Sequence, residues 1–281
     1  MDSLVFTAVL FAAACHAGWN TAIKIGSDTL SATVLIAIGA GIVGLVLLPF
    51  VGVPLSAAWP WIAASLAIHL FYFIGLSESY RVGDLGQVYP LARGTAPLMT
   101  ATLSAPLVGE TLGPFGWGGI FALASGVLLL SARGGRALAR VDWHSTAFAL
   151  FTAVTICAYS LVDGMGARLS GSANAYTACL FIGNAVVLAA YAVVRLRGKV
   201  LGTIAPYWVT GLAAGFLQFA SYGIVIWAMT VAPIAIVAAL RETSVLFGAA
   251  LAVVFLKEPL RLIRIVAAVM IVSGLLMIRL R

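Results

Sequence analysis

The sequence predicts an all-α integral membrane protein with ten transmembrane helices, arranged as two inverted five-helix repeats. Three observations predict this fold class: an extremely apolar composition, a regular series of long apolar runs, and an internal repeat. Of the 281 residues, 63% are hydrophobic and 9% are charged, and the mean hydropathy is +1.11. These values lie outside the range of soluble globular domains. The function is therefore expected to take place within a membrane.

The apolar runs are roughly 20 residues long, which is the length a helix needs to cross a bilayer core of about 30 Å. Short polar or Gly/Pro-rich breaks separate them and leave no aqueous domain of any size. No basic residue precedes the first run and no small-residue cleavage site follows it, so we expect a retained helix there. The ten expected spans are 3–24, 30–51, 59–80, 84–108, 114–132, 143–165, 173–195, 205–229, 233–256 and 259–279.

An internal repeat relates the two halves of the chain. Residues 91–133 and 239–281 align without a gap at a shift of 148 and share 11 identities in 43 positions. The shared residues include Arg93 with Arg241 and Glu110 with Glu258. Five helices per half is an odd number, so the second half must enter the membrane in the opposite sense. The expected units are therefore inverted repeats over 1–137 and 138–281, an architecture typical of alternating-access transporters that bind substrate near the midplane.

The distribution of basic residues predicts the orientation. The loops after odd-numbered spans hold eleven lysines and arginines, and the opposite side holds three. Cytoplasmic loops carry the excess of basic residues, so we expect both termini outside the cytoplasm and a multi-pass protein of the bacterial inner membrane.

The candidate site residues are polar side chains that lie deep in the spans and share helical faces. In the first span, for example, His16, Trp19 and Asn20 are spaced i, i+3, i+4. In the fourth span, Pro90 and Pro97 are expected to interrupt the backbone hydrogen bonds and free carbonyl groups. The candidate substrate-binding residues are Arg93, Arg241, His16, Trp19, Asn20, His69, Tyr72, Tyr89, Tyr159, Gln218, Tyr222 and Glu242.

Arg93 and Arg241 are the strongest of these candidates. An arginine at bilayer depth costs at least ~2.5 kcal/mol, so it should face a protein interior and have a partner or a ligand. The alternative to substrate binding is an internal ion pair, of Arg93 with Glu242 and of Arg241 with Asp163 or Glu78. Because Asp163 and Glu78 fall near the ends of their spans, the deep charge is expected to lean cationic. Glu110 and Glu258 lie at loop edges, where capping of the following helix is the simpler expectation.

Ten helices in two inverted halves, each with a Gly-Glu or Lys-Glu turn, resemble the drug/metabolite transporter superfamily of the EamA type. The turns are Gly109-Glu110-Thr111-Leu112 and Lys257-Glu258-Pro259-Leu260. The resemblance covers essentially the whole chain and implies a secondary carrier of small metabolites with a central cavity. The stretches 15–20 and 82–94 are similar to a subgroup of EamA proteins, some of them associated with phosphonate use.

The sequence thus predicts a secondary transporter of a small anionic or zwitterionic metabolite, such as an amino acid or an organophosphonate. Arginine binds carboxylate and phosphonate groups bidentately, and His16 or Glu242 could carry a coupling proton. A cationic drug exporter would need an unpaired deep carboxylate, and a lipid flippase would need a lateral opening. An intramembrane enzyme would need a nucleophile with its base or a metal cluster, and the three cysteines match no metal spacing. We expect no enzymatic activity, no cofactor and no nucleic acid partner, and a monomer or homodimer in contact with membrane lipid.

Overall fold

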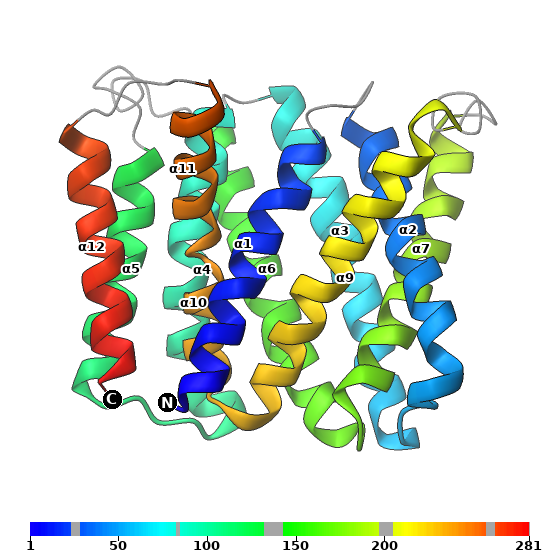
Figure 1. The fold of residues 1–281 in the computed structure, drawn as a ribbon, viewed down its shortest axis with the longest axis horizontal. Coiled ribbons are helices and arrows are strands. Elements are labelled where there is room, and N and C mark those ends of the chain that lie inside the picture. The colour runs from blue at the N-terminus through cyan, green and yellow to red at the C-terminus, as the bar shows by residue number, and fades with distance from the viewer. Residues whose placement is uncertain (24–28, 83–84, 132–142, 197–204, 257–261, 281) are drawn as a thin grey trace.

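The computed structural model describes residues 1–23, 29–82, 85–131, 143–196, 205–256 and 262–280. These residues form helices and connecting turns, with no strand among them. Figure 1 shows the long helices standing side by side, with both chain ends on one side of the bundle. The helices, numbered as in Figure 1, are α1 Ser3–Ile23, α2 Thr29–Val51, the 3-10 turn η1 Ser56–Ala58, α3 Trp59–Val82, α4 Leu85–Val108, α5 Pro114–Ser131, α6 Trp143–Leu169, α7 Ala173–Leu196, the 3-10 turn η2 Ala205–Tyr207, α9 Trp208–Val231, α10 Ile234–Arg241, α11 Ser244–Leu256 and α12 Leu262–Arg279.

Most of these helices are long and apolar enough to cross a membrane. Eight segments of the described residues meet both criteria, in α1, α2, η1 with α3, α6, α7, α9, α10 with α11, and α12. Helix α5 carries a shorter apolar stretch, Pro114–Leu130. A helix of 24 residues such as α7 is about 36 Å long at ~1.5 Å per residue, which matches a bilayer core. Described helical residues fall within each of the ten expected ranges, so the structure is compatible with the ten-helix prediction.

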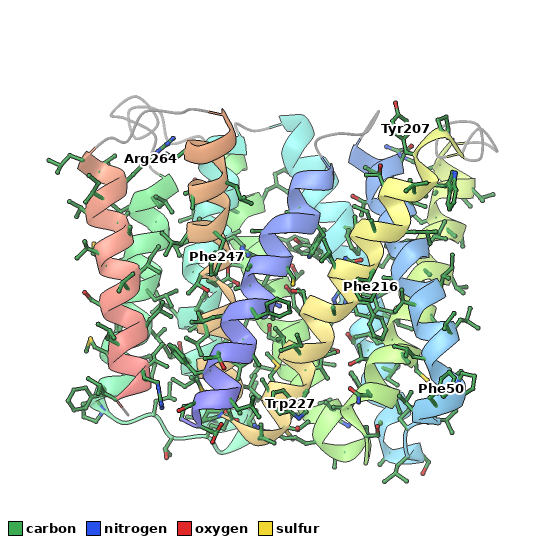
Figure 2. All side chains as sticks on the ribbon, viewed as in Figure 1. Phe50, Tyr207, Phe216, Trp227, Phe247 and Arg264 are labelled. Carbon is green, nitrogen blue, oxygen red and sulfur yellow. The ribbon has the colours of Figure 1, made fainter. Side chains whose placement is uncertain are left out.

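Apolar side chains cover the outside of the bundle, and polar side chains lie within it. Phe50 is 83% exposed and Phe216 is 58% exposed, and Figure 2 shows both on the outer helices. Asp163 and Ser104, by contrast, are fully buried. This distribution is the one expected of helices surrounded by lipid, where polar groups must find their partners inside the protein.

Helices α5 and α12 pack closely, and glycines permit this approach. A Cβ atom added at Gly119 would lie 2.8 Å from the carbonyl oxygen of Gly274, and one added at Gly274 would lie 2.7 Å from that of Gly119. One added at Gly126 would lie 2.9 Å from the carbonyl oxygen of Ala267. Small residues let helix backbones approach in a membrane, where association depends on close packing. The 148-residue shift of the internal repeat relates position 119 to 267 and position 126 to 274. The contact of 119 with 274 and the contact of 126 with 267 are therefore equivalent under the repeat.

Corresponding helices of the two halves run in opposite directions. In Figure 1 the chain enters α5 from the side that carries both termini, whereas it leaves α12 toward that side. Helix α4 likewise runs opposite to α10 and α11. The packing partners follow the same relation. Helix α1 corresponds to α6 of the second half, and α3 corresponds to α9. The pair of α1 with α9 is therefore equivalent to the pair of α6 with α3, and both pairs pack together.

One local expectation was wrong: the range 233–256 is not one helix, because α10 ends at Arg241 and α11 begins at Ser244. Pro90 and Pro97 lie within α4, which continues as a helix past both of them. A proline removes one N–H donor, and a helix can continue past it where neighbouring helices pack around the chain. The break in the second half instead occurs where no proline or glycine stands.

Candidate substrate-binding site

The site is organised around the two residues that separate α10 from α11. Every residue of α10 is buried. The N–H group of Glu242 donates to the carbonyl oxygen of Ala239 at 3.0 Å, so the chain tightens into an i to i+3 turn at the helix end. The hydroxyl of Thr243 donates to the carbonyl oxygen of Leu240 at 2.7 Å, and the helix resumes at Ser244. This turn places adjacent charged residues inside the bundle.

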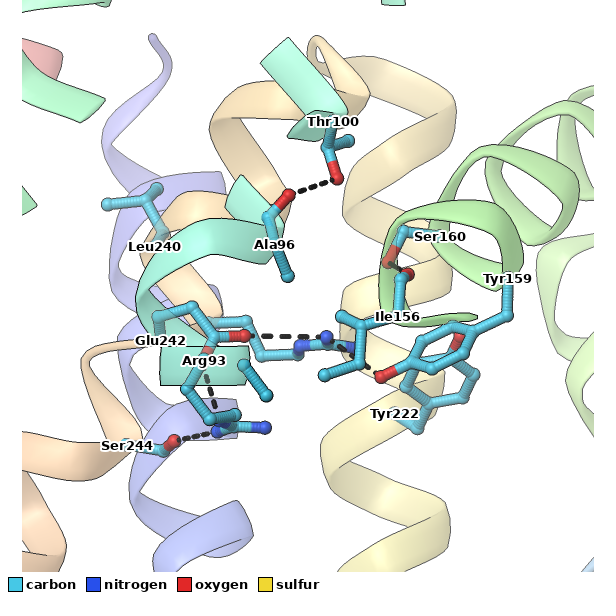
Figure 3. A network of polar contacts seen from close by, with 12 residues as sticks. Arg93, Ala96, Thr100, Ile156, Tyr159, Ser160, Tyr222, Leu240, Glu242 and Ser244 are labelled. Atoms are coloured by element: carbon cyan, nitrogen blue, oxygen red, sulfur yellow. Dashed lines mark hydrogen bonds and ion pairs between the residues drawn. The ribbon is translucent and has the colours of Figure 1, made fainter. Parts of the chain in front are cut away.

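Arg93 of α4 forms a buried ion pair with this turn. Its Nε lies 2.6 Å from Oε2 of Glu242, and its Nη2 donates to Oγ of Ser244 at 2.6 Å. The Arg93 residue is 4% exposed and Glu242 is 1% exposed. Figure 3 shows Arg93 between these two partners. The pairing is the one that the sequence offered as the alternative for Arg93, and it joins the first half of the chain to the second.

Arg241 is also buried, but its carboxylate contact is weaker. Its Nη2 lies 3.5 Å from Oε1 of Glu242 and donates to the hydroxyl oxygen of Tyr159 at 3.0 Å. Its Cζ lies 5.4 Å from the ring centroid of Tyr159 and 5.9 Å from that of Tyr222, within range of cation–π attraction. Its Nε is buried and has no hydrogen-bond partner among the described residues. Arg241 therefore shares the Glu242 carboxylate with Arg93, and its Nε–H donor is available to a ligand.

Asp163 of α6 is the second buried carboxylate. The hydroxyl of Tyr222 donates to its Oδ2 at 2.5 Å, and that of Tyr176 donates to its Oδ1 at 2.9 Å. Asp163 lies in the last two turns of α6, near the helix end as expected, but it is fully buried and so belongs to the interior charge from which the sequence-based reasoning had left it out. The expected ion pair between Arg241 and Asp163 is absent from the described contacts, and Tyr222 lies between the two. The side chain of Glu78 lies outside the described residues.

With Asp163 included, the buried charge balances. Arg93 and Arg241 face Glu242 and Asp163, so the expected cationic excess is not found among the buried charged residues that the structure describes. Two positive and two negative groups share the interior. This balance bears directly on the kind of molecule that could bind there.

Aromatic rings from α6 and α9 contact the guanidinium of Arg241, and rings from α3 pack against them. The ring of His69 stacks on Tyr159 at 4.6 Å, and Tyr72 meets Tyr159 edge-on at 6.0 Å. The rings of Tyr159 and Tyr222 lie 6.1 Å apart in an edge-to-face arrangement. Nδ1 of His69 lies 2.9 Å from the carbonyl oxygen of Ser65, which fixes the imidazole orientation. The contacts therefore join seven of the twelve candidate residues into one cluster: Arg93, Arg241, Glu242, Tyr159, Tyr222, His69 and Tyr72.

The other five candidates join this cluster through no described hydrogen bond, ion pair or ring contact, although His16 lies within range of the charges of Arg93 and Arg241. His16 and Trp19 pack edge-to-face at 4.9 Å, and Asn20 donates back to the carbonyl oxygen of His16 at 2.9 Å. Trp19 Nε1 and Gln218 Oε1 are buried and have no hydrogen-bond partner among the described residues. The side chain of Tyr89 lies outside the described residues.

Sequence reasoning named Asp163 as a possible partner of Arg241 but did not count it among the substrate-binding candidates, and it did not name Tyr176 or Ser244. Asp163 was noticed as a polar residue within a span, so a signal existed and was discounted. Tyr176 and Ser244 carry no such signal, since a tyrosine or a serine in an apolar span is common. Only their proximity to charged groups far away in the sequence identifies them.

A second polar cluster lies on the side of the bundle that carries the termini. Oε1 of Glu110 accepts from Arg168 Nη2 at 2.5 Å and from the backbone N–H of Ile234 at 3.0 Å. Nε of Arg168 in turn donates to the carbonyl oxygen of Met229 at 2.9 Å. Glu110 thus caps α10 and not the following helix α5, which corrects the sequence expectation. Glu258 lies outside the described residues.

Comparisons with known proteins agree with this architecture. Residues 144–280 match the model of the EamA-like transporter family. One solved crystal structure aligns with 99% of this chain and 96% of its own chain, with a TM-score of 0.70 and 19% sequence identity. At that identity the likeness establishes the fold alone. No curated protein matches the chain.

Proposed function

We propose that this chain, whose residues 144–280 match the EamA-like transporter family, is a member of the drug/metabolite transporter superfamily that carries a small anionic or zwitterionic metabolite by alternating access. The observation that supports this substrate class is the state of Arg241. Its guanidinium is nearly fully buried, its one carboxylate contact spans 3.5 Å, and its Nε is unpartnered among the described residues. A buried guanidinium with spare donors suits a carboxylate or phosphonate group, as in an amino acid or an organophosphonate.

Arg241 is a better acid-group ligand than Arg93, which the sequence had favoured. Arg93 is committed to Glu242 and Ser244, both at 2.6 Å. An entering acid group would compete with Glu242 for Arg241 only, and would leave the tighter ion pair intact.

Several observations support two inverted repeats, 1–137 and 138–281. The corresponding helices run in opposite directions, and exchanging the halves exchanges the packing partners. The broken helix formed by α10 and α11 carries two of the four buried charges that the structure describes, Arg241 and Glu242, at its break. Discontinuous helices that line a central site are a recurring feature of transporters built from inverted repeats. Rocking of one half against the other would expose such a site to each side in turn.

We place the termini outside the cytoplasm of a bacterial inner membrane. The eleven-to-three distribution of basic residues supports this orientation. Both termini lie on one side of the bundle, and Arg195 lies at the end of α7 on the other side. Alkaline phosphatase fused after residue 281 should be active, whereas an active cytoplasmic reporter at the same position would reverse the assignment.

The substrate class is tested by transport into proteoliposomes. Purified wild-type protein and Arg241→Gln are compared for uptake of labelled amino acids and organophosphonates. Loss of a hydrogen bond to a charged group costs about 1.5–3 kcal/mol, so uptake at limiting substrate should fall at least about tenfold. Arg195→Gln is the matched control, since Arg195 is exposed. Undiminished uptake by a correctly folded Arg241→Gln variant would refute the assignment.

A further inference from the structure

Asp163 is a buried carboxylate that, among the residues the structure describes, only neutral groups hold. Its two oxygens accept hydrogen bonds from the hydroxyls of Tyr176 and Tyr222. The ion pairs among the described residues involve Glu110 and Glu242, and none involves Asp163 within 4.0 Å. A buried carboxylate without a positive partner is costly, because its hydration is lost and nothing of opposite charge replaces it. The site around Asp163 therefore favours a cation.

Arg241 is the complementary group at the other end of the same cluster. Its one carboxylate, Glu242, is shared with Arg93 and lies 3.5 Å away. Tyr222 contacts both charged groups. Its ring lies 5.9 Å from the guanidinium carbon of Arg241, and its hydroxyl donates to Asp163. One positive and one negative group, each incompletely compensated, thus flank a single tyrosine.

The groups that face Asp163 suit an ammonium ion. Tyr176 comes from α7 and Tyr222 from α9, while His69 of α3 and Phe181 of α7 each place a ring 6.1 Å from that of Tyr222. Aromatic faces attract cations. A carboxylate has about four acceptor positions, so two tyrosine donors leave capacity for an ammonium group.

We infer that Asp163 binds the positively charged amino group of a zwitterionic substrate while Arg241 binds its acid group. This assignment rests on the proposed function and narrows it, because it requires both charges on one molecule. The tyrosine hydroxyls hold the carboxylate in place when no substrate is bound. Substrate entry adds a cation to Asp163 and an anion to Arg241, so the charge of the interior stays balanced.

The test measures binding of matched probe pairs that differ only in the amino group. The probes are 2-aminoethylphosphonate with ethylphosphonate, and phenylalanine with 3-phenylpropionate, titrated into purified protein by calorimetry. Wild-type protein should bind the aminated member of a pair at least about tenfold more tightly, since a hydrogen bond to a charged group is worth about 1.5–3 kcal/mol. In Asp163→Asn this preference should disappear, while affinity for the deaminated member changes less than about threefold. Tyr176→Phe keeps the carboxylate and should keep the preference.

Three outcomes would overturn the inference: no amino-group preference in the wild-type protein, a preference retained in Asp163→Asn, or equal losses for both members of each pair. Asp163→Ser supplies the same comparison should Asp163→Asn aggregate during purification. Failure of the proposed function gives a different result. In that case no acid-bearing probe binds the wild-type protein, or Arg241→Gln leaves binding of the deaminated probes unchanged, and the inference falls with its premise.

Discussion

Replacing Glu242 by glutamine should destabilise the protein by about 3–5 kcal/mol, the usual cost of removing one partner of a buried ion pair. Glu242 is the carboxylate partner of both Arg93, at 2.6 Å, and Arg241, at 3.5 Å. These arginines are 4% and 2% exposed, so water cannot take the place of the carboxylate. Asp163 forms no ion pair with either arginine among the described contacts. The variant would therefore retain two buried positive charges and lose their shared counter-ion.

The measurement is reversible unfolding in detergent micelles, followed by tryptophan fluorescence, for a double-mutant cycle. Glu242→Gln, Arg93→Gln and the double variant should give a coupling energy of at least ~2 kcal/mol, because the double variant removes both members of the pair. The same cycle with Arg241→Gln should give a smaller coupling, since that contact is longer. Wild-type stability in Glu242→Gln, or a coupling near zero with Arg93, would refute the buried ion pair.

Three further variants test other contacts by the same unfolding assay. Glu110→Gln should cost roughly 1–2 kcal/mol, the value of a helix cap plus a partly exposed ion pair, and an unchanged midpoint would mean that the cap contributes nothing. Gly119→Ala should weaken the packing of α5 on α12, whereas Gly113→Ala, where an added Cβ meets nothing within 4 Å, is its control; equal behaviour of the two would contradict the close approach. Tyr159→Phe removes the acceptor for Arg241 and should cost about 1–2 kcal/mol, and a stabilised variant would exclude that hydrogen bond.

The helix positions follow from the sequence because a bilayer sets one length for every apolar run. The range expected for α7, 173–195, agrees with the observed Ala173–Leu196 to within one residue at the end. The break between α10 and α11 escaped prediction because Glu242 and Thr243 are neither glycine nor proline. The helix breaks where Glu242 contacts Arg93 of α4, and nothing in the local sequence indicates that contact.

The site could be predicted in part for a similar reason. Arginines in an apolar span are conspicuous, and the internal repeat drew attention to both Arg93 and Arg241. The pairing of Arg93 with Glu242 followed from charge alone. The position of Asp163 could not be derived this way, because its burial depends on Tyr176 and Tyr222 arriving from two other helices. Distance from a helix end along the sequence proved a poor measure of depth within the bundle.

The contact of Glu110 with Arg168 and Ile234 ties together chain segments that otherwise could move separately. One carboxylate oxygen of Glu110, in the turn between α4 and α5, accepts hydrogen bonds from Arg168 in the last turn of α6 and from the first residue of α10. Arg168 also donates to a carbonyl oxygen near the end of α9. Separating the halves at this side of the membrane would break both bonds of Glu110 together, since both are made by the same carboxylate oxygen. Opening there should consequently behave as one cooperative step with a single barrier, not as a gradual loosening of independent loops.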